Sequence, residues 1–270
     1  MKHLFTKRYA LFVLLICVLF CFGAMNTSRA EGESQSDEDD LSIYKNNPNY
    51  KIVDGLAIEI ATNTLVMCRS DARSVIVPSN VKTIGFSAFM ESSMLQSVVV
   101  SEGVTEIESC AFQGHENLTS ITLPTTLKVV YNYAFDQCNF DTLIIPRNTF
   151  LEPNLGQSEW YGVLDGCNVK MLVFCGTDGL FLPTTFANIK FPSDGSGRIV
   201  FWGNPPEYID VTGLQFNYRG GEVGSVTFTI CYPAKFAKAW SPNGETEWNG
   251  VPIRALSWSE EQKLLQKAPK

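Results

Sequence analysis

Three residues with reactive side chains recur at matching positions of a repeated pattern. Cys138 and Cys167 stand in two Asp-x-Cys-Asn segments 29 residues apart, and His115 lies 23 residues before Cys138. In stacked repeats such positions lie about 4.8 Å apart, which would allow a disulfide, or a His–Cys pair acting on a metal or as base and nucleophile. A single histidine in a turn is usually solvated, however. We therefore expect buried thiols, with no metal, no cofactor and no catalytic residue.

Carboxylates form two further groups that could do acid–base chemistry. Glu102, Glu106 and Glu108 share one turn of the repeat, with no apolar pocket around them to shift a pKa, so we interpret them as solubilising surface. The second group belongs to the less regular C-terminal half, near Trp202: Asp165, Asp178, Asp194 and Glu207. Two of these carboxylates about 5–9 Å apart in a cleft would suit glycoside hydrolysis. A secreted, glycan-active hydrolase is thus an alternative function.

Charge and histidine content exclude other classes of partner. The 270-residue chain carries a formal net charge of −7, and the charge is more negative still without the basic N-terminal segment. Such a balance argues against nucleic-acid phosphate as a partner. His115 is the only histidine after His3, which disfavours zinc sites built on paired histidines.

Residues 1–30 have the organisation of a signal peptide. Basic residues precede an apolar run, Ala10–Phe22, and Ser28-Arg29-Ala30 supplies the small residues that a signal peptidase recognises. We expect cleavage after Ala30 and a secreted or cell-surface protein with no stable membrane span. An uncleaved anchor would need about 20 apolar residues, and a lipoprotein would need a small residue before Cys17 or Cys21. Residues 31–50 are predicted to be an acidic, disordered spacer, since the first ten hold six acids and no apolar side chain.

Internal repetition indicates the fold. Three segments of 22 or 23 residues start at Ser74, Ser97 and Ser120, and they share an Ala-Phe pair together with other aligned apolar positions. Each has a short β-branched run, then a turn, then an Ile/Val-x-x-x-Ala-Phe segment. A single unit would expose half of its apolar atoms, whereas stacked units bury them in one continuous core. The pattern predicts a solenoid with a parallel β-sheet.

These units resemble the BspA-like leucine-rich repeat family of bacterial surface and secreted proteins, whose units read approximately I-P-x-x-V-x-x-I-G-x-x-A-F-x-x-C-x-x-L. The resemblance is specific over Ser74 to Asp141. It implies an α/β repeat solenoid with the parallel β-sheet on the concave face and short helices or turns on the convex face. It also implies export and a role in attachment or binding rather than catalysis.

The remaining segments complete the predicted organisation. Residues 51–73 are predicted to form an N-terminal hairpin cap, with Gly55–Cys68 turning at Ala61-Thr62-Asn63. The other divisions are regular repeats over 74–145, longer irregular repeats and a C-terminal cap over 146–256, and a short helical tail over 257–270. In the cap, CYPAKFAKAW resembles the family's terminal strand, Tyr-Pro turn and short helix. Ser259 with Gln262 is a candidate capping box for a helix from Glu260 to Lys267.

The outward side chains of the predicted sheet form a candidate ligand-binding stripe. The stripe takes one residue from each strand: Ile76, Val99, Thr122, Ile144, Val173 and Val200. A row of exposed aliphatic residues on a concave sheet favours binding, although β-propensity alone would also select such residues. Trp202 and Tyr208 are candidate exposed aromatics, able to stack on sugars or to anchor a protein.

Together these features predict an exported leucine-rich-repeat protein that mediates adhesion or binding. The expected partner is an extracellular protein or glycan, with no nucleic acid and no cofactor. The hydrolase described above and a structural component of the cell envelope are the alternatives.

Overall fold

The computed structural model describes residues 41–152, 162–176, 189–206, 228–248 and 250–267. The chain divides into two compact units, Met1–Glu38 and Asp39–Lys270. All of the described residues lie in the second unit. Among them, no helix is both long enough and apolar enough to cross a membrane.

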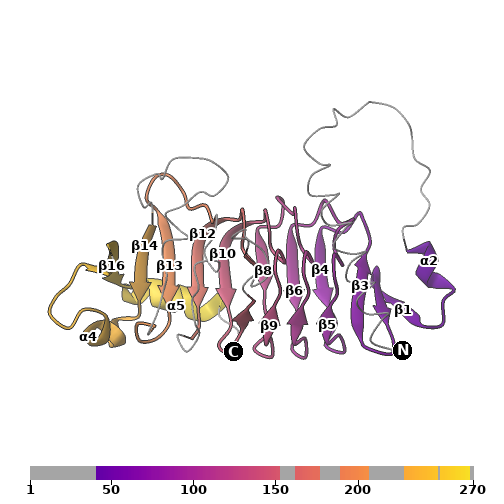
Figure 1. The fold of residues 1–270 in the computed structure, drawn as a ribbon, viewed down its shortest axis with the longest axis horizontal. Helices are drawn as coiled ribbons and strands as arrows, with labels where there is room; N and C mark the ends of the chain where they lie inside the picture. Colours follow the sequence, from indigo (N-terminus) through magenta and orange to yellow (C-terminus); the bar gives the residue numbers. More distant parts are fainter. Residues whose placement is uncertain (1–40, 153–161, 177–188, 207–227, 249, 268–270) are drawn as a thin grey trace, which may run out of the picture. The chain divides into compact units, whose positions relative to one another are not determined.

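The second unit is a stack of coils whose long strands form a nine-stranded sheet (Figure 1). Neighbouring strands are parallel except for the terminal pair, β15 and β16. In spatial order the strands are β15 (Glu247–Trp248), β16 (Val251–Ala255), β14 (Phe228–Tyr232), β13 (Gly197–Phe201), β12 (Asn168–Phe174), β10 (Asn139–Ile145), β8 (Ser120–Thr122), β6 (Ser97–Val100) and β4 (Ser74–Val77). This is the parallel sheet that the repeats predict.

The other side of the coils carries a seven-stranded sheet. Its strands in spatial order are β1 (Tyr50–Val53), β2 (Leu56–Glu59), β3 (Thr64–Cys68), β5 (Thr83–Ile84), β7 (Glu106–Ile107), β9 (Val129–Val130) and β11 (Phe150–Leu151). Strands β2 and β3 form the predicted N-terminal hairpin, and β1 adds a third antiparallel strand that the sequence patterns do not reveal. From β3 to β11 the pairing is parallel. Short helices or turns are expected on this side. The coils instead pair there through strands of two residues, β5, β7, β9 and β11.

The prediction of a disordered spacer through residue 50 is wrong for its last ten residues. A short helix, α2 (Ser42–Lys45), precedes β1. Leu41 is buried, and the rings of Tyr44 and Tyr50 contact each other edge to face, with their centroids 5.0 Å apart. The acidic decapeptide 31–40 lacks apolar side chains, whereas this segment supplies enough of them to pack on the cap.

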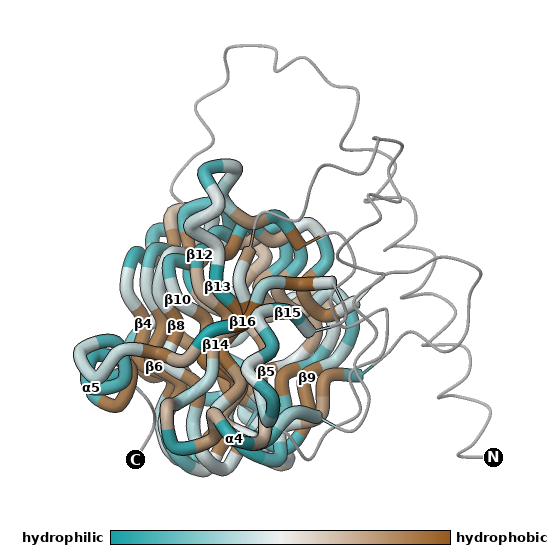
Figure 2. Tube along the Cα trace, turned by 90° about the vertical axis from the view of Figure 1, so that its left-hand side faces the viewer, coloured by the Kyte–Doolittle hydropathy of each residue, from teal (hydrophilic) through white to brown (hydrophobic). Residues whose placement is uncertain are grey.

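The core lies between the two sheets and is built from one layer per coil. Val75 and Val77 are buried, whereas Ile76 between them is exposed, as alternation along a strand requires. Phe89, Phe112 and Phe135 stack from coil to coil, with ring centroids 4.5 and 5.6 Å apart. Viewed along the stack, hydrophobic positions line both sheets and hydrophilic ones occupy the connecting turns (Figure 2).

The C-terminal end of the stack has its own cap. After β14, Pro233 leads into a short helical segment, η2 (Ala234–Phe236) and α4 (Ala237–Trp240). This is the strand, Tyr-Pro turn and short helix that the sequence predicts. Trp240 stacks on Tyr232, with ring centroids 5.3 Å apart, and its Nε1 donates a hydrogen bond of 2.8 Å to the carbonyl of Gly203. The cap is thereby fixed to the preceding coil.

The tail forms helix α5 (Trp258–Lys267). Its capping box is Ser257 with Glu260, not Ser259 with Gln262 as predicted. The Glu260 N–H donates to Ser257 Oγ at 3.3 Å, and the Ser257 N–H donates to a carboxylate oxygen of Glu260 at 2.7 Å. The spacing of the motif is as expected, but the helix begins two residues earlier and so includes Ser259.

Candidate ligand-binding face

The outward face of the nine-stranded sheet carries one continuous row of side chains. We call this row the outer row; its members are Ile76, Val99, Thr122, Ile144, Val173, Val200, Cys231 and Arg254. Pairing of neighbouring strands places these residues side by side, in register from β4 to β16. The six residues of the predicted stripe therefore do lie in one row.

The outer row is open at one end and covered at the other. Ile76 is 67% exposed and Val99 is 44% exposed, and Thr122 is also exposed. By contrast, the side chains of Ile144, Val173 and Val200 are buried, at 8%, 2% and 0%. The expectation that the whole stripe is accessible is therefore wrong for these last three residues.

Helix α5 covers the C-terminal part of the outer row. It lies outside the coils on the side of the nine-stranded sheet (Figures 1 and 2). The covered residues form a separate hydrophobic cluster on the outside of the sheet, comprising Ile144, Val173, Val200, Cys231, Leu256 and Leu264. Leu264 is the only fully buried residue of the helix. The solenoid thus uses part of its outward face to bind its own C-terminal helix.

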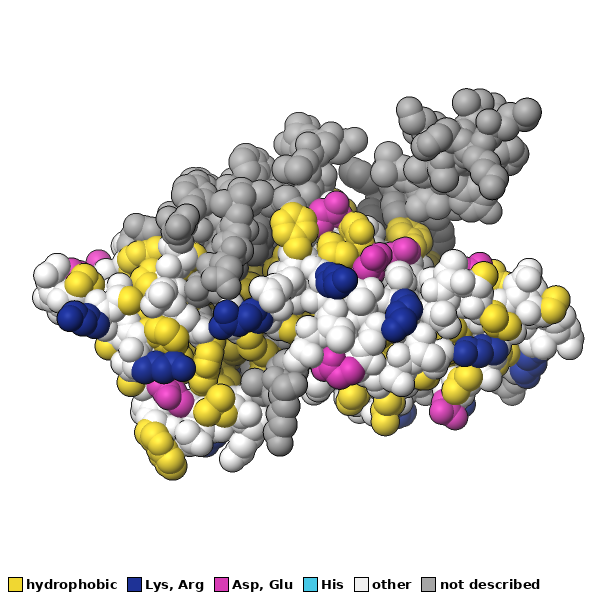
Figure 3. Space-filling view, turned by 90° about the horizontal axis from the view of Figure 1, so that it is seen from below, with side chains coloured by type: hydrophobic (Ala, Val, Ile, Leu, Met, Phe, Trp, Pro, Cys, Tyr) yellow, Lys and Arg dark blue, Asp and Glu magenta, His cyan; other side chains and the backbone are white. Residues whose placement is uncertain are grey.

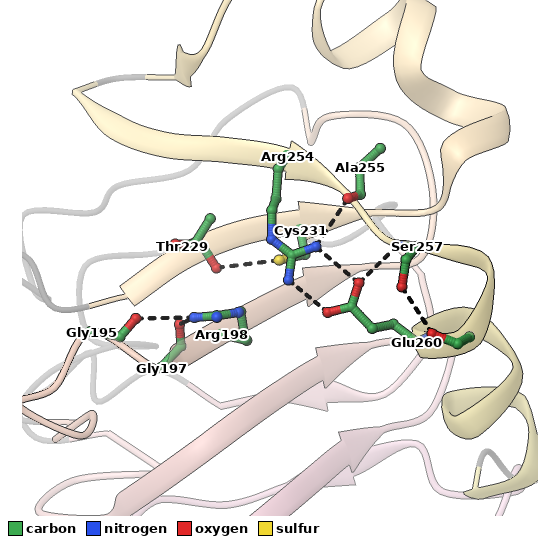
Figure 4. Close-up of polar contacts among 10 residues, drawn as sticks. Gly195, Gly197, Arg198, Thr229, Cys231, Arg254, Ala255, Ser257 and Glu260 are labelled. Atoms are coloured by element: carbon green, nitrogen blue, oxygen red, sulfur yellow. Dashed lines mark hydrogen bonds and ion pairs between the residues drawn. The ribbon is translucent and has the colours of Figure 1, made fainter.

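An ion pair fixes the beginning of α5 to the edge of the sheet. Arg254, the last residue of the outer row, donates two hydrogen bonds to the carboxylate of Glu260, at 3.0 and 2.7 Å (Figure 4). The Arg254 guanidinium holds the pKa of Glu260 at about 2. Glu261 accepts a further hydrogen bond of 2.6 Å from the N–H of Ala234 in the cap. Three segments of the chain therefore meet at the start of the helix.

Cys231 lies beneath this helix and is shielded from solvent. Its side chain is fully buried, and burial raises the pKa of its thiol to about 11. The guanidinium groups of Arg254 and Arg198 oppose that effect only in part. Cys231 is therefore an unreactive thiol as long as α5 stays in place.

The two aromatic candidates do not add an exposed site. Trp202 is half-buried and packs against the covered cluster of the outer row. Tyr208 lies outside the described residues. The most exposed tryptophan of the described residues is Trp258, at 76%, on the first turn of α5. The sequence alone does not reveal this, because the exposure of Trp258 depends on which side of α5 packs against the sheet. The side with Leu264 is buried, and Trp258 stays in solvent.

The recurring cysteine and histidine positions form a buried polar ladder. Ser92, His115, Cys138 and Cys167 occupy equivalent places in successive coils, and each is buried. Cys138 Sγ donates to the carbonyl of Phe112 at 3.1 Å, and Cys167 Sγ donates to that of Phe135 at 2.7 Å. Burial raises the pKa of both thiols, and the two cysteines are not joined by a disulfide.

The prediction of a solvated histidine is wrong. His115 is 3% exposed, with Nδ1 2.9 Å from the carbonyl oxygen of Phe112 and Nε2 2.9 Å from that of Phe89. The side chain thus links two coils through their backbones, a role in which Ser92 replaces it in the preceding coil.

Two of the four carboxylates of the C-terminal half, Asp165 and Asp194, lie among the described residues, in different surroundings. Asp165 is buried, whereas Asp194 lies at the surface and accepts a hydrogen bond from Ser196. Asp178 and Glu207 lie outside the described residues. On the repeat turn, Glu102 accepts hydrogen bonds from Thr125 and Thr126 of the following coil, so it ties coils together as well as solubilising them.

Charged side chains are not concentrated at one place on the connecting turns of the coils that Figure 3 shows. Lysine and arginine side chains are scattered along these turns among neutral ones, whereas hydrophobic side chains gather towards the C-terminal coils (Figure 3). Within the described ranges, no group of three or more His, Cys, Asp or Glu side chains is placed to hold a metal ion.

Comparison with known proteins agrees with this architecture. Residues 49–155 match the model of the BspA type leucine rich repeat region, in six copies. No curated protein matches the chain in sequence. The crystal structure of the pneumococcal vaccine antigen PcpA is similar over 79% of this chain and 49% of its own, with a TM-score of 0.52 and 17% identity. A leucine-rich repeat protein from Bacteroides ovatus aligns over 77% of this chain and 74% of its own, with a TM-score of only 0.26 and 14% identity.

The similarity to PcpA is evidence for the fold alone. The chain spans about half the length of that protein. Both the family model and the PcpA structure indicate a leucine-rich-repeat solenoid, which is also what the strand pairing shows.

Proposed function

We propose that the chain is an exported protein that binds a protein ligand through the open end of its outer row. The match of residues 49–155 to the BspA type leucine rich repeat region supports this proposal. Proteins with BspA-type repeats are typically secreted or held on the bacterial surface, and leucine-rich repeats generally serve protein interaction or adhesion. The signal-peptide pattern of residues 1–30 supports the same location.

The observation that carries this proposal is the exposure of Ile76 and Val99. A β-branched side chain that is 44–67% exposed in the middle of a regular strand leaves apolar surface in contact with water. At the covered end of the same row, helix α5 buries the equivalent side chains. A ligand bound at the open end would likewise remove the apolar surface of Ile76 and Val99 from water, which is favourable.

The chemistry of the open end favours a protein over a glycan as the ligand. Its outer-row residues, Ile76, Val99 and Thr122, include no aromatic ring on which a sugar could stack. Aliphatic side chains pack well against the apolar side chains of another protein. Adhesion to a protein of the surroundings is the form of binding that fits best.

The test is a binding screen of the chain from Glu31 against extracellular proteins and glycans, with Val99→Lys as the variant. The matched control is Ile60→Lys, because Ile60 is similarly exposed, at 49%, but lies in the turn of the cap hairpin. We expect a protein ligand whose affinity falls at least about tenfold with Val99→Lys and is unchanged with Ile60→Lys. Equal binding by the wild type and both variants would refute the proposal.

A further inference from the structure

Helix α5 shows which kind of structure the outer row can hold. It lies across the strands, and its buried Leu264 contributes to the cluster formed by the outer-row residues of β10, β12, β13 and β14. A ten-residue helix is about 15 Å long. Four strands spaced about 4.8 Å apart span about 14 Å. The length of α5 therefore matches the four strands whose outer-row side chains are buried.

The repeat distances of helix and sheet also agree. Successive turns of an α-helix present a side chain to the same face about every 5.4 Å. A helix that crosses parallel strands can thus present side chains to the row at nearly the spacing of the strands, and α5 does so with one fully buried side chain, Leu264. This match depends only on strand spacing, so it holds at the open end of the row as well.

The open end continues the α5 site without interruption. The strands that follow β10 are β8, β6 and β4, and strand pairing keeps Thr122, Val99 and Ile76 in the same row as the covered residues. Along one side of this end the row is flanked by small residues, Ser74, Ser97 and Ser120. Ser97 Oγ donates a hydrogen bond of 2.8 Å to Ser74 Oγ, which keeps these side chains low on the sheet. The side chains along this flank are therefore short.

We propose that strands β8, β6 and β4 bind an amphipathic α-helix of a partner protein, laid across the strands in line with α5. This inference rests on the proposed function and specifies its ligand. The partner helix presents an apolar side chain to the row, as α5 presents Leu264, and this side chain contacts Ile76 and Val99. Its outer face remains in solvent, as does the side of α5 that carries the exposed Trp258.

The experiment uses the whole mature chain with a peptide of residues 257–270 as the probe. One form of the peptide is held helical by a lactam between Lys263 and Ser259→Glu. The other carries Gln262→Pro, which prevents the helix but keeps Leu264 and Leu265. Each is titrated into protein labelled on Ile and Val methyl groups, and NMR follows the methyl signals.

We expect saturable shifts at Ile76 and Val99 with the helical peptide, and at least about tenfold weaker binding of the proline peptide. The methyl signals of Ile43 and Ile60, which are exposed elsewhere, serve as internal controls and should not move. Absence of saturable shifts would overturn the inference. Shifts confined to Val173 and Val200 would also overturn it, because the peptide would then be replacing α5.

Equal binding of both peptides at Ile76 and Val99 would overturn the helical ligand but not the proposed function, since the open end would still bind. Failure of the proposed function has a different signature. It appears as unchanged binding of protein ligands by Val99→Lys in the screen described above.

Discussion

Glu260 fixes the beginning of α5 to the edge of the sheet. Its carboxylate accepts two hydrogen bonds from Arg254 and one from the N–H of Ser257, so a single side chain joins the sheet edge to the helix start. The pair is about one-third exposed on each side. Solvent therefore weakens it, and we assign it about 1 kcal/mol rather than the larger value of a buried pair.

Replacing this carboxylate should increase the opening of α5. With Glu260→Gln, we expect the thiol of Cys231 to react roughly fivefold faster with a small disulfide reagent, because 1 kcal/mol changes the open population by about that factor. Peptide mapping after timed labelling measures the rate at Cys231. Glu247→Gln, an exposed glutamate on β15, is the control and should leave the rate unchanged. An unchanged rate in Glu260→Gln would show that the ion pair does not hold the helix.

The same carboxylate should make stability depend on pH. The pKa of Glu260 is depressed to about 2 in the folded state, from its ordinary value of 4.5. Its stabilising contribution is therefore complete above about pH 4.5 and is lost as the pH falls towards 2. In urea titrations at pH 6 and pH 3, the wild type should lose about 0.6 kcal/mol more stability than Glu260→Gln, because roughly 60% of the contribution is gone at pH 3. An identical loss in both would contradict this assignment.

At the scale of elements, each coil depends on its neighbours through the phenylalanine stack. Phe112 is fully buried between Phe89 and Phe135. Phe112→Ala should lower the free energy of unfolding by about 3–5 kcal/mol, because it leaves a cavity in the middle of the stack. Phe150→Ala is the matched control: Phe150 is 53% exposed, so its loss should change stability by less than about 0.5 kcal/mol. Urea unfolding measures both, and equal effects would contradict the stacked core.

The elements show which structural features a local pattern can predict. The Ala-Phe spacing predicts the coils because those contacts recur at a fixed separation, and the alternating runs around Ala61-Thr62-Asn63 predict the β2–β3 hairpin. The capping box is found at the wrong serine because Ser257 and Ser259 are both followed three residues later by a residue that can reciprocate, Glu260 or Gln262. Only the contact of Glu260 with Arg254 distinguishes the two, and that contact joins β16 to α5.

At the scale of the whole molecule, one end of the solenoid differs from the other in what its outward face contacts. The alternation of side chains along the strands predicts the outer row, but not its division into covered and open parts. That division depends on where the C-terminal helix returns to the sheet, and no repeat carries this information. In the buried ladder, the sequence predicts the burial of the Cys138 thiol but not that of His115.

The division of the outer row is the central claim, and cysteine accessibility tests it most directly. Val99→Cys and Val173→Cys place a thiol in the same row, at sites that are 44% and 2% exposed. Labelling of each folded variant, with the wild type as background, should be at least about 100-fold faster at position 99 than at position 173. Comparable rates at the two positions would contradict the claim, because α5 would then not cover the row and the open end would not be a distinct binding face.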